Sequence, residues 1–269
     1  MKKIHCCILV LLLVFTNVMS QHFDKNTVLT KGTTYYMFGD NVKLREAPGL
    51  DSKTLVLLPI GSEIKILDMM EISHMYNGIS SPWYKVSFEN QIGYLVGGLI
   101  SIYRHASHKD SNTNFLCNLS EKDERVFVNI RATSKGKVID EVSVRLIGNG
   151  SFQFKNIGHR GVKQLHDILF VDNDSESCGV NGGKSYVFWD GTTLRHVANT
   201  SEIGDGGLYH HHSEYIFPED KDGRENVVIY KEEHGELKDE ETEWYVTTKQ
   251  ERNLTWDGEK FLPVNYREE

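Results

Sequence analysis

Apolar and polar residues alternate along much of the chain. Residues 42–45 (Val-Lys-Leu-Arg) and 63–67 (Glu-Ile-Lys-Ile-Leu) show the pattern clearly, and residues 83–88 and 92–96 form further short β-like segments rich in aromatic residues. Such alternation is typical of a strand with one buried side and one solvent-facing side. Glycine, proline, asparagine and aspartate separate the segments, as turns require. No stretch has the periodicity of a long amphipathic helix, so the sequence predicts an all-β fold.

The strand-like segments fall into two regions. Residues 34–103 contain short segments at close spacing, which predicts a small barrel. Residues 104–114 are polar and lack apolar periodicity, and we interpret them as an interdomain linker. Residues 115–269 contain a second series, for which we expect a β-rich domain built either as a sandwich or as propeller-like blades. Residues 21–33 are polar and are expected to form a short leader.

One short string occurs twice in the second region. Trp-Asp-Gly stands at residues 189–191 and again at residues 256–258, each time between apolar runs. Asp-Gly between two apolar runs is a strong hairpin signal, because a tight two-residue turn needs positive φ angles. The repetition predicts two similar hairpins, or two sheets of a repeated architecture.

The N-terminus has the pattern of a secretory signal peptide. Lys2 and Lys3 precede an unbroken apolar run at residues 8–15, which is too short to span a bilayer. Small or tolerated residues at positions 18–20 then offer a cleavage site before Gln21. We therefore expect residues 1–20 to be removed and the protein to be exported, to the periplasm or the cell surface, with no transmembrane anchor after cleavage. The alternative is an uncleaved N-terminal anchor.

Composition narrows the class of partner. The 269 residues carry 39% hydrophobic and 25% charged residues, which is typical of a globular protein, and a formal net charge of −8. Nucleic-acid binding is disfavoured, because phosphate contacts need clustered lysine and arginine. Without residues 1–20 the chain keeps only Cys117 and Cys178. In an oxidising compartment they either pair or remain two free thiols, and their spacing does not decide between the two.

Four segments in residues 34–103 resemble the bacterial SH3-like (SH3b) domain. Residues 41–48 (Asn-Val-Lys-Leu-Arg-Glu-Ala-Pro) are similar to that family's Asn-Val-Arg segment, and residues 57–66 to its strand-glycine-strand stretch. Residues 83–86 (Trp-Tyr-Lys-Val) and 93–95 (Gly-Tyr-Leu) resemble its last two strands, with tyrosine replacing tryptophan in the second. The sequence departs from the family at residues 68–82, a connection that is long for a hairpin.

The resemblance implies a non-catalytic module that binds cell-wall peptide or peptidoglycan, or that serves as an adaptor to an envelope protein. The surface aromatic residues Tyr36 and Tyr84 are then the groove candidates, and the guanidinium group of Arg45 would bind a carboxylate. The alternative is that both aromatic rings pack inside the barrel.

Three consecutive histidines stand at residues 210–212. On a strand His210 and His212 point to the same side, and Glu214 continues that side. Neutral imidazoles two positions apart can share a transition metal. The alternative is a polar strand or turn at the surface.

An acidic loop at residues 220–225 (Asp-Lys-Asp-Gly-Arg-Glu) precedes an apolar run. Asp220, Asp222 and Glu225 would supply the oxygen ligands that calcium prefers, and the string faintly resembles the loops of FG-GAP propeller repeats. It is shorter than an EF-hand loop and lacks the distal glutamate, so the alternative is a solvated turn.

No nucleophile elbow, phosphate-binding loop or zinc-protease helix occurs in the sequence. We therefore expect an exported, non-catalytic binding or adaptor protein of the bacterial envelope. The alternatives are a metal-dependent enzyme or a calcium-stabilised module, either with its site in residues 115–269.

Overall fold

The computed structural model describes residues 22–148, 150–173, 178–239 and 241–264. Strands connected by turns make up nearly all of this part, with one short 3-10 helix, η1 (Gly97–Leu99). The predicted all-β fold is confirmed. The predicted signal peptide, residues 1–20, lies outside the described residues. None of the helices in the described part is long and apolar enough to cross a membrane.

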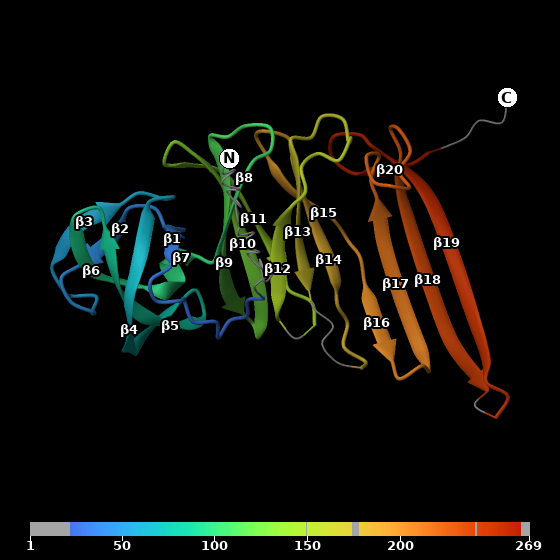
Figure 1. The fold of residues 1–269 in the computed structure, drawn as a ribbon, viewed down its shortest axis with the longest axis horizontal. Helices are drawn as coiled ribbons and strands as arrows, with labels where there is room; N and C mark the ends of the chain where they lie inside the picture. Colours follow the sequence, from blue (N-terminus) through green and yellow to red (C-terminus); the bar gives the residue numbers. More distant parts are fainter. Residues whose placement is uncertain (1–21, 149, 174–177, 240, 265–269) are drawn as a thin grey trace, which may run out of the picture.

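The first sheet, which we call the barrel sheet, is strongly curved and has the strand order β3-β2-β6-β5-β4-β1-β7 (Figure 1). Its strands are β1 (Thr34–Met37), β2 (Val42–Arg45), β3 (Thr54–Leu58), β4 (Glu63–Tyr76), β5 (Ile79–Phe88), β6 (Gln91–Val96) and β7 (Ile100–Ser101). Its buried side encloses a core that includes Leu44, Ile64 and Val86. Residues 68–82, the long connection in sequence, extend the β4–β5 hairpin beyond this core.

Three further sheets follow, each an antiparallel meander of consecutive strands. The second sheet contains β8 (Tyr103–Ala106), β9 (Thr113–Lys122), β10 (Arg125–Ser134) and β11 (Lys137–Arg145). The third sheet contains β12 (Phe152–Asn156), β13 (Asp167–Asn173), β14 (Gly183–Trp189) and β15 (Leu194–Asn199). The fourth sheet contains β16 (Glu202–Asp205), β17 (Tyr209–Ile216), β18 (Val228–Asp239), β19 (Trp244–Trp256) and β20 (Phe261–Pro263).

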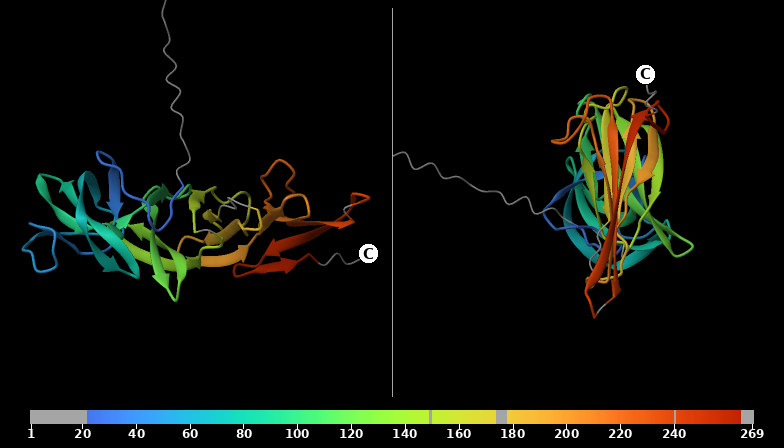
Figure 2. Two further views of the ribbon diagram at one scale, coloured as in Figure 1. Left: turned by 90° about the horizontal axis from the view of Figure 1, so that it is seen from below. Right: turned by 90° about the vertical axis from the view of Figure 1, so that its right-hand side faces the viewer.

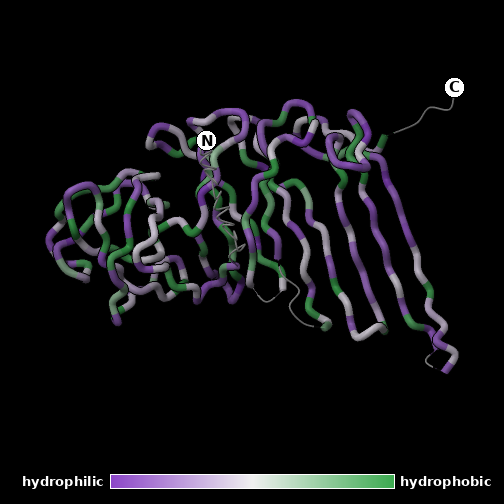
Figure 3. The backbone as a smooth tube through the Cα atoms, in the orientation of Figure 1, coloured by the Kyte–Doolittle hydropathy of each residue, from purple (hydrophilic) through white to green (hydrophobic). Residues whose placement is uncertain are grey.

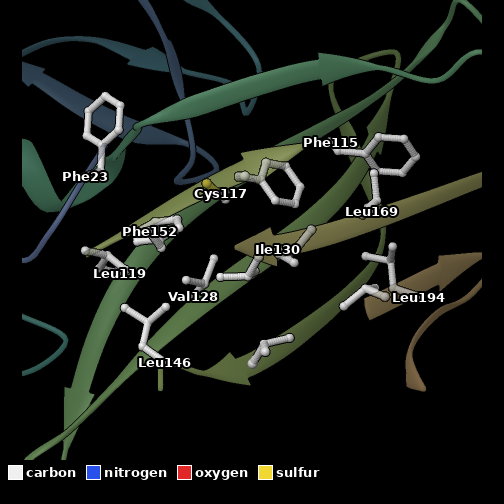
Figure 4. Packing of buried hydrophobic residues seen from close by; sticks show 14 of the residues in the cluster. Phe23, Phe115, Cys117, Leu119, Val128, Ile130, Leu146, Phe152, Leu169 and Leu194 are labelled. Carbon is white, nitrogen blue, oxygen red and sulfur yellow. The ribbon is translucent and has the colours of Figure 1, made fainter. Parts of the chain in front are cut away.

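The sheets follow one another in a row from the barrel sheet to the fourth sheet (Figures 1 and 2). The third sheet lies between the other two meanders, because alternate residues of β13 and β14 face opposite cores. Leu169 packs with the second sheet (Figure 4), and so does Val187, whereas Phe170 and Phe188 pack with the fourth. Burial on both faces explains the continuous apolar runs of these two strands. The β-rich region after the barrel sheet is therefore a row of consecutive antiparallel meanders that share cores between neighbours.

The barrel sheet is fixed to the outer face of the second sheet. Phe38 and Leu116 share a small buried cluster there. The Arg131 guanidinium lies over the Phe38 ring, 4.5 Å from its centroid, and donates to the Phe38 carbonyl oxygen at 2.8 Å. The side-chain amide of Asn118 donates to the carbonyl oxygens of Gly98 and Ile100 at 2.9 and 2.6 Å. Apolar packing and buried hydrogen bonds therefore hold the two parts together.

The prediction that residues 104–114 form a linker without secondary structure is wrong. Part of residues 104–114 forms β8 and the start of β9, and these strands pair with each other. The segment is polar because β8 is a sheet edge and because Asp110 accepts hydrogen bonds from Asn112 and Thr113 to close the turn. The predicted leader is also packed against the fold, since Phe23 is 3% exposed and forms an isolated bridge with Phe152.

The two Trp-Asp-Gly strings adopt the same turn. Gly191 and Gly258 both have φ of +105°. Asp190 accepts hydrogen bonds from the backbone N–H groups of the second and third residues after it, and Asp257 does the same. The first turn joins β14 to β15 and the second joins β19 to β20, so each links the last two strands of its sheet. The repeated Trp-Asp-Gly string therefore marks equivalent positions in two successive sheets.

In the described part of the chain, Cys117 and Cys178 are free thiols. Cys117 is fully buried between the second and third sheets (Figure 4), and burial raises the pKa of its thiol. Cys178 is exposed.

Candidate functional site

A cleft of about 230 Å³ lies where three parts of the chain meet. Residues 24–29 form one wall and β5 with η1 forms another, while Ile102 and β9 of the second sheet close the third side. Beside residues 24–29, its lining consists of Ile79, Ser80, Ser81, Pro82, Tyr84, Gly97, Gly98, Ile102, Asn118 and Leu119. We call this feature the junction cleft.

Residues 24–29 are held in place by their own turn and by contacts to both sheets. Asp24 Oδ1 accepts from the Asn26 N–H at 2.8 Å and from the Thr27 hydroxyl at 2.9 Å, which closes a local turn. Lys25 forms an ion pair with Glu121 on β9 at 2.9 Å. The Leu29 N–H donates to the Tyr84 hydroxyl oxygen at 3.0 Å. The wall of the cleft is therefore anchored at both of its ends.

The far side of the cleft depends on the absence of two side chains. A Cβ on Gly97 would lie 2.7 Å from Cε2 of Tyr84, and a Cβ on Gly98 would lie 2.7 Å from Cδ1 of Tyr76. Both distances are shorter than van der Waals contact allows. Glycine at these positions lets η1 approach Tyr84 on β5 and Tyr76 on β4 closely.

The lining combines apolar surface with polar groups that have hydrogen-bonding capacity to spare. Ser81 is buried to 8% exposure, and in the described part of the chain its hydroxyl has no hydrogen-bond partner. The Asn118 amide nitrogen is used by Gly98 and Ile100, whereas its Oδ1 makes no hydrogen bond to the described residues. Val28, 50% exposed, adds an apolar side chain to the wall. The cleft thus offers a hydroxyl group and an amide oxygen beside apolar contacts.

The structure separates the three residues that we predicted to bind a ligand. Tyr84 lines the junction cleft, but it is 1% exposed and belongs to the barrel core, and burial raises the pKa of its hydroxyl. Tyr36 lies under the Arg104 guanidinium, 4.5 Å from the ring centroid, beside the contact with the second sheet. Arg45 donates to the Ser52 carbonyl oxygen at 2.7 Å. Within the described residues, no hydrogen bond or ring contact joins these three side chains, and ligand binding by them stays a prediction.

Sequence reasoning missed Ser81, Asn118 and residues 24–29. None of them belongs to a recognisable motif. They come together only because the barrel sheet docks on the second sheet.

His210, His212 and Glu214 share the outer face of β17, the side turned away from the third sheet, as their alternation predicts. His210 contacts Glu233 Oε1 at 3.2 Å and the Tyr245 hydroxyl at 2.6 Å. A shallow hollow of about 390 Å³ on the fourth sheet is lined in part by His212 and Glu214. Within the described residues, no group of three or more histidine, cysteine or acidic side chains is placed to hold a metal ion. Metal binding by these residues stays a prediction.

The fourth sheet ends the row of sheets, and its strands β18 and β19 carry mostly hydrophilic residues (Figure 3). On the outer face Lys249 pairs with Glu233 at 2.6 Å. The Lys249 ammonium group and His210 hold the pKa of the Glu233 carboxyl below its ordinary value, although partial desolvation acts the other way. Such a polar face suits the exposed end of a stack of sheets.

The predicted calcium loop precedes β18. Arg160 donates through Nε to Asp220 Oδ1 at 2.9 Å and forms an ion pair with the same carboxylate, while the Phe217 N–H donates to Oδ2 at 2.8 Å. Both oxygens of Asp220 are thus engaged by groups of the protein. Glu225 accepts from Asn226 at 3.2 Å, and Asp222 lies in the exposed turn. Arg160 thus supplies a positive charge to Asp220, and calcium binding by this loop stays a prediction.

Comparisons with models of protein families, with curated proteins and with solved structures found no match.

Proposed function

We propose that this chain is an exported, non-catalytic binding protein of the bacterial envelope, and that it binds a cell-wall peptide in the junction cleft. The observation that carries the proposal is the cleft itself, where Ser81 and Asn118 present unused hydrogen-bonding groups beside Val28. The resemblance of residues 34–103 to the SH3b domain and the signal-peptide pattern of residues 1–20 support the same assignment.

The chemistry of the lining favours a short peptide. A peptide backbone offers N–H and C=O groups that pair with the amide oxygen of Asn118 and the hydroxyl of Ser81, and small side chains fill the apolar part. The ordered walls reduce the entropy that the protein loses on binding, because residues 24–29 are already fixed by Asp24, Lys25 and Leu29.

The experiment is co-sedimentation of residues 21–269 with isolated peptidoglycan. Val28→Glu places a charge in the cleft and is expected to reduce the pelleted fraction strongly. The matched control is Val138→Glu on β11, which introduces the same charge at an exposed valine, 38% exposed, that does not line the cleft. The control is expected to pellet like the unchanged protein.

Ser81→Ala provides a second, milder change. Because the hydroxyl has no partner in the described part of the chain, its removal is expected to change the free energy of unfolding by less than about 0.5 kcal/mol. The same change is expected to weaken sedimentation several-fold. Failure of the unchanged protein to pellet, or equal sedimentation of the two valine variants, would contradict the proposal.

A further inference from the structure

Strand β19 has a long edge that no strand of the described residues covers. One edge pairs with β18 from Leu254 to Trp244. On the other edge β20 pairs only with residues 254–256, and the Val264 N–H donates to the Asn253 carbonyl oxygen at 2.9 Å. Among the described residues, 244–252 therefore form the outermost strand of the row along this edge (Figure 1).

The unused backbone groups of this edge can be identified. In a regular strand, the N–H and C=O groups of successive residues point alternately to the two edges. The Asn253 carbonyl points towards β20, so the backbone groups of Tyr245, Thr247, Lys249 and Glu251 point to the same edge. These donors and acceptors are a template for a further strand.

Charged side chains protect only half of this edge against pairing with another strand. Lys249, Glu251 and Arg252 carry charges, as protected edges usually do. Residues 244–248 (Trp-Tyr-Val-Thr-Thr) carry none, and Trp244 and Tyr245 are 61% and 36% exposed. An uncharged, aromatic half of an edge strand is unprotected against pairing.

We propose that a second copy of this chain pairs here, β19 against β19, antiparallel about a two-fold axis at Thr248. β20 blocks the edge beyond residue 252, and the stretch 244–252 is centred on Thr248. Only this register therefore pairs the whole free edge of both copies. It also makes Thr247 and Lys249 a directly opposed pair, and likewise Tyr245 and Glu251, with their free backbone groups facing each other.

The side chains fit the same register. The uncharged half of one copy lies opposite the charged half of the other, so no two like charges are directly opposed. Trp244 lies opposite Arg252, a pairing of an aromatic ring with a guanidinium group that is favourable across strands. This complementarity lies within a single strand, which favours a second copy over a foreign strand as the occupant.

The test is the mass of residues 21–269 in solution, measured by light scattering after size exclusion over a range of concentrations. The unchanged protein is expected to shift from the monomer mass to twice that mass as its concentration rises. Thr247→Lys places a lysine opposite Lys249 of the second copy at two symmetric positions and is expected to raise the dimer dissociation constant at least about tenfold. Thr247→Glu places a glutamate there instead and is expected to retain or strengthen the dimer.

Both variants change the same exposed side chain, so their melting temperatures should match that of the unchanged protein. Thr247→Pro tests the backbone, because it removes an N–H that points to the free edge and leaves the pairing with β18 intact. It is expected to abolish the dimer. A monomer at every concentration, equal dissociation constants for the lysine and glutamate variants, or an unaffected dimer in the proline variant would overturn the proposal.

Discussion

Replacement of Phe188 by alanine tests whether the third and fourth sheets share one core. Phe188 is 1% exposed, and its ring centroid lies 4.9 Å from that of Trp256, 5.6 Å from Phe261 and 6.3 Å from Phe217. The ring belongs to the third sheet and all three neighbours lie in or beside the fourth. Removing the ring costs the free energy of its transfer from water, and it also leaves a cavity between the two sheets.

A buried phenylalanine replaced by alanine costs about 3–5 kcal/mol. Domains are stable by only about 5–15 kcal/mol, so this loss is a large part of the total. The assay is urea unfolding followed by circular dichroism and by tryptophan fluorescence. The control is Ile92→Ala at an exposed position of β6, 56% exposed, for which a change within about 0.5 kcal/mol is expected. A loss below about 1 kcal/mol for Phe188→Ala would refute the packing of these two sheets through this cluster.

Two further predictions concern single groups. Burial acts to raise the pKa of the Asp190 carboxyl, but hydrogen bonds from Thr192 and Arg195 outweigh it and lower that pKa to about 2. The resulting stabilisation is present above the unfolded pKa of 3.8 and is lost as the pH falls from about 4 to 2. Because the Asp190 side chain is 28% exposed, we expect this stabilisation to be about 1 kcal/mol. Asp190→Asn should remove this part of the pH dependence, which is measured as the difference between urea midpoints at pH 5 and pH 3. Alkylation of native residues 21–269 should label Cys178 and leave Cys117 unmodified. The denatured protein should carry two labels when its mass is measured by mass spectrometry. Labelling of Cys117 in the native protein would contradict its burial.

Local patterns were sufficient to predict most strands. Residues 42–45 alternate in sequence and form β2, and the placement of His210 and His212 on one face follows from their spacing alone. The positions of the hairpins at Asp190 and Asp257 were also visible, because the hairpin signal is local. The tight two-residue turn was wrong, since four residues join the strands in each case and only the glycine has a positive φ. These features depend on neighbouring residues and on the period of a strand.

Contacts between sheets were not predictable in the same way. Phe23 stands in a polar stretch, and only the pairing with Phe152 buries it. The sequence left open whether Tyr84 lies in a groove or packs inside the barrel, and the structure places its ring in the core with its hydroxyl accepting from the Leu29 N–H. The sequence of the acidic loop did not indicate that Asp220 pairs with Arg160, because Arg160 lies far away in sequence. The junction cleft belongs to this class, because it exists only where two sheets meet.

Hydrogen exchange, followed by mass spectrometry, is the most direct test of the junction cleft as the binding site. The sample is residues 21–269 with and without soluble peptidoglycan fragments that carry the cell-wall peptide. We expect slower exchange in peptides that cover residues 24–29, 79–84 and 97–98, and unchanged exchange in the fourth sheet. Slower exchange confined to residues 45–52 or to the fourth sheet, or no change anywhere, would contradict the assignment.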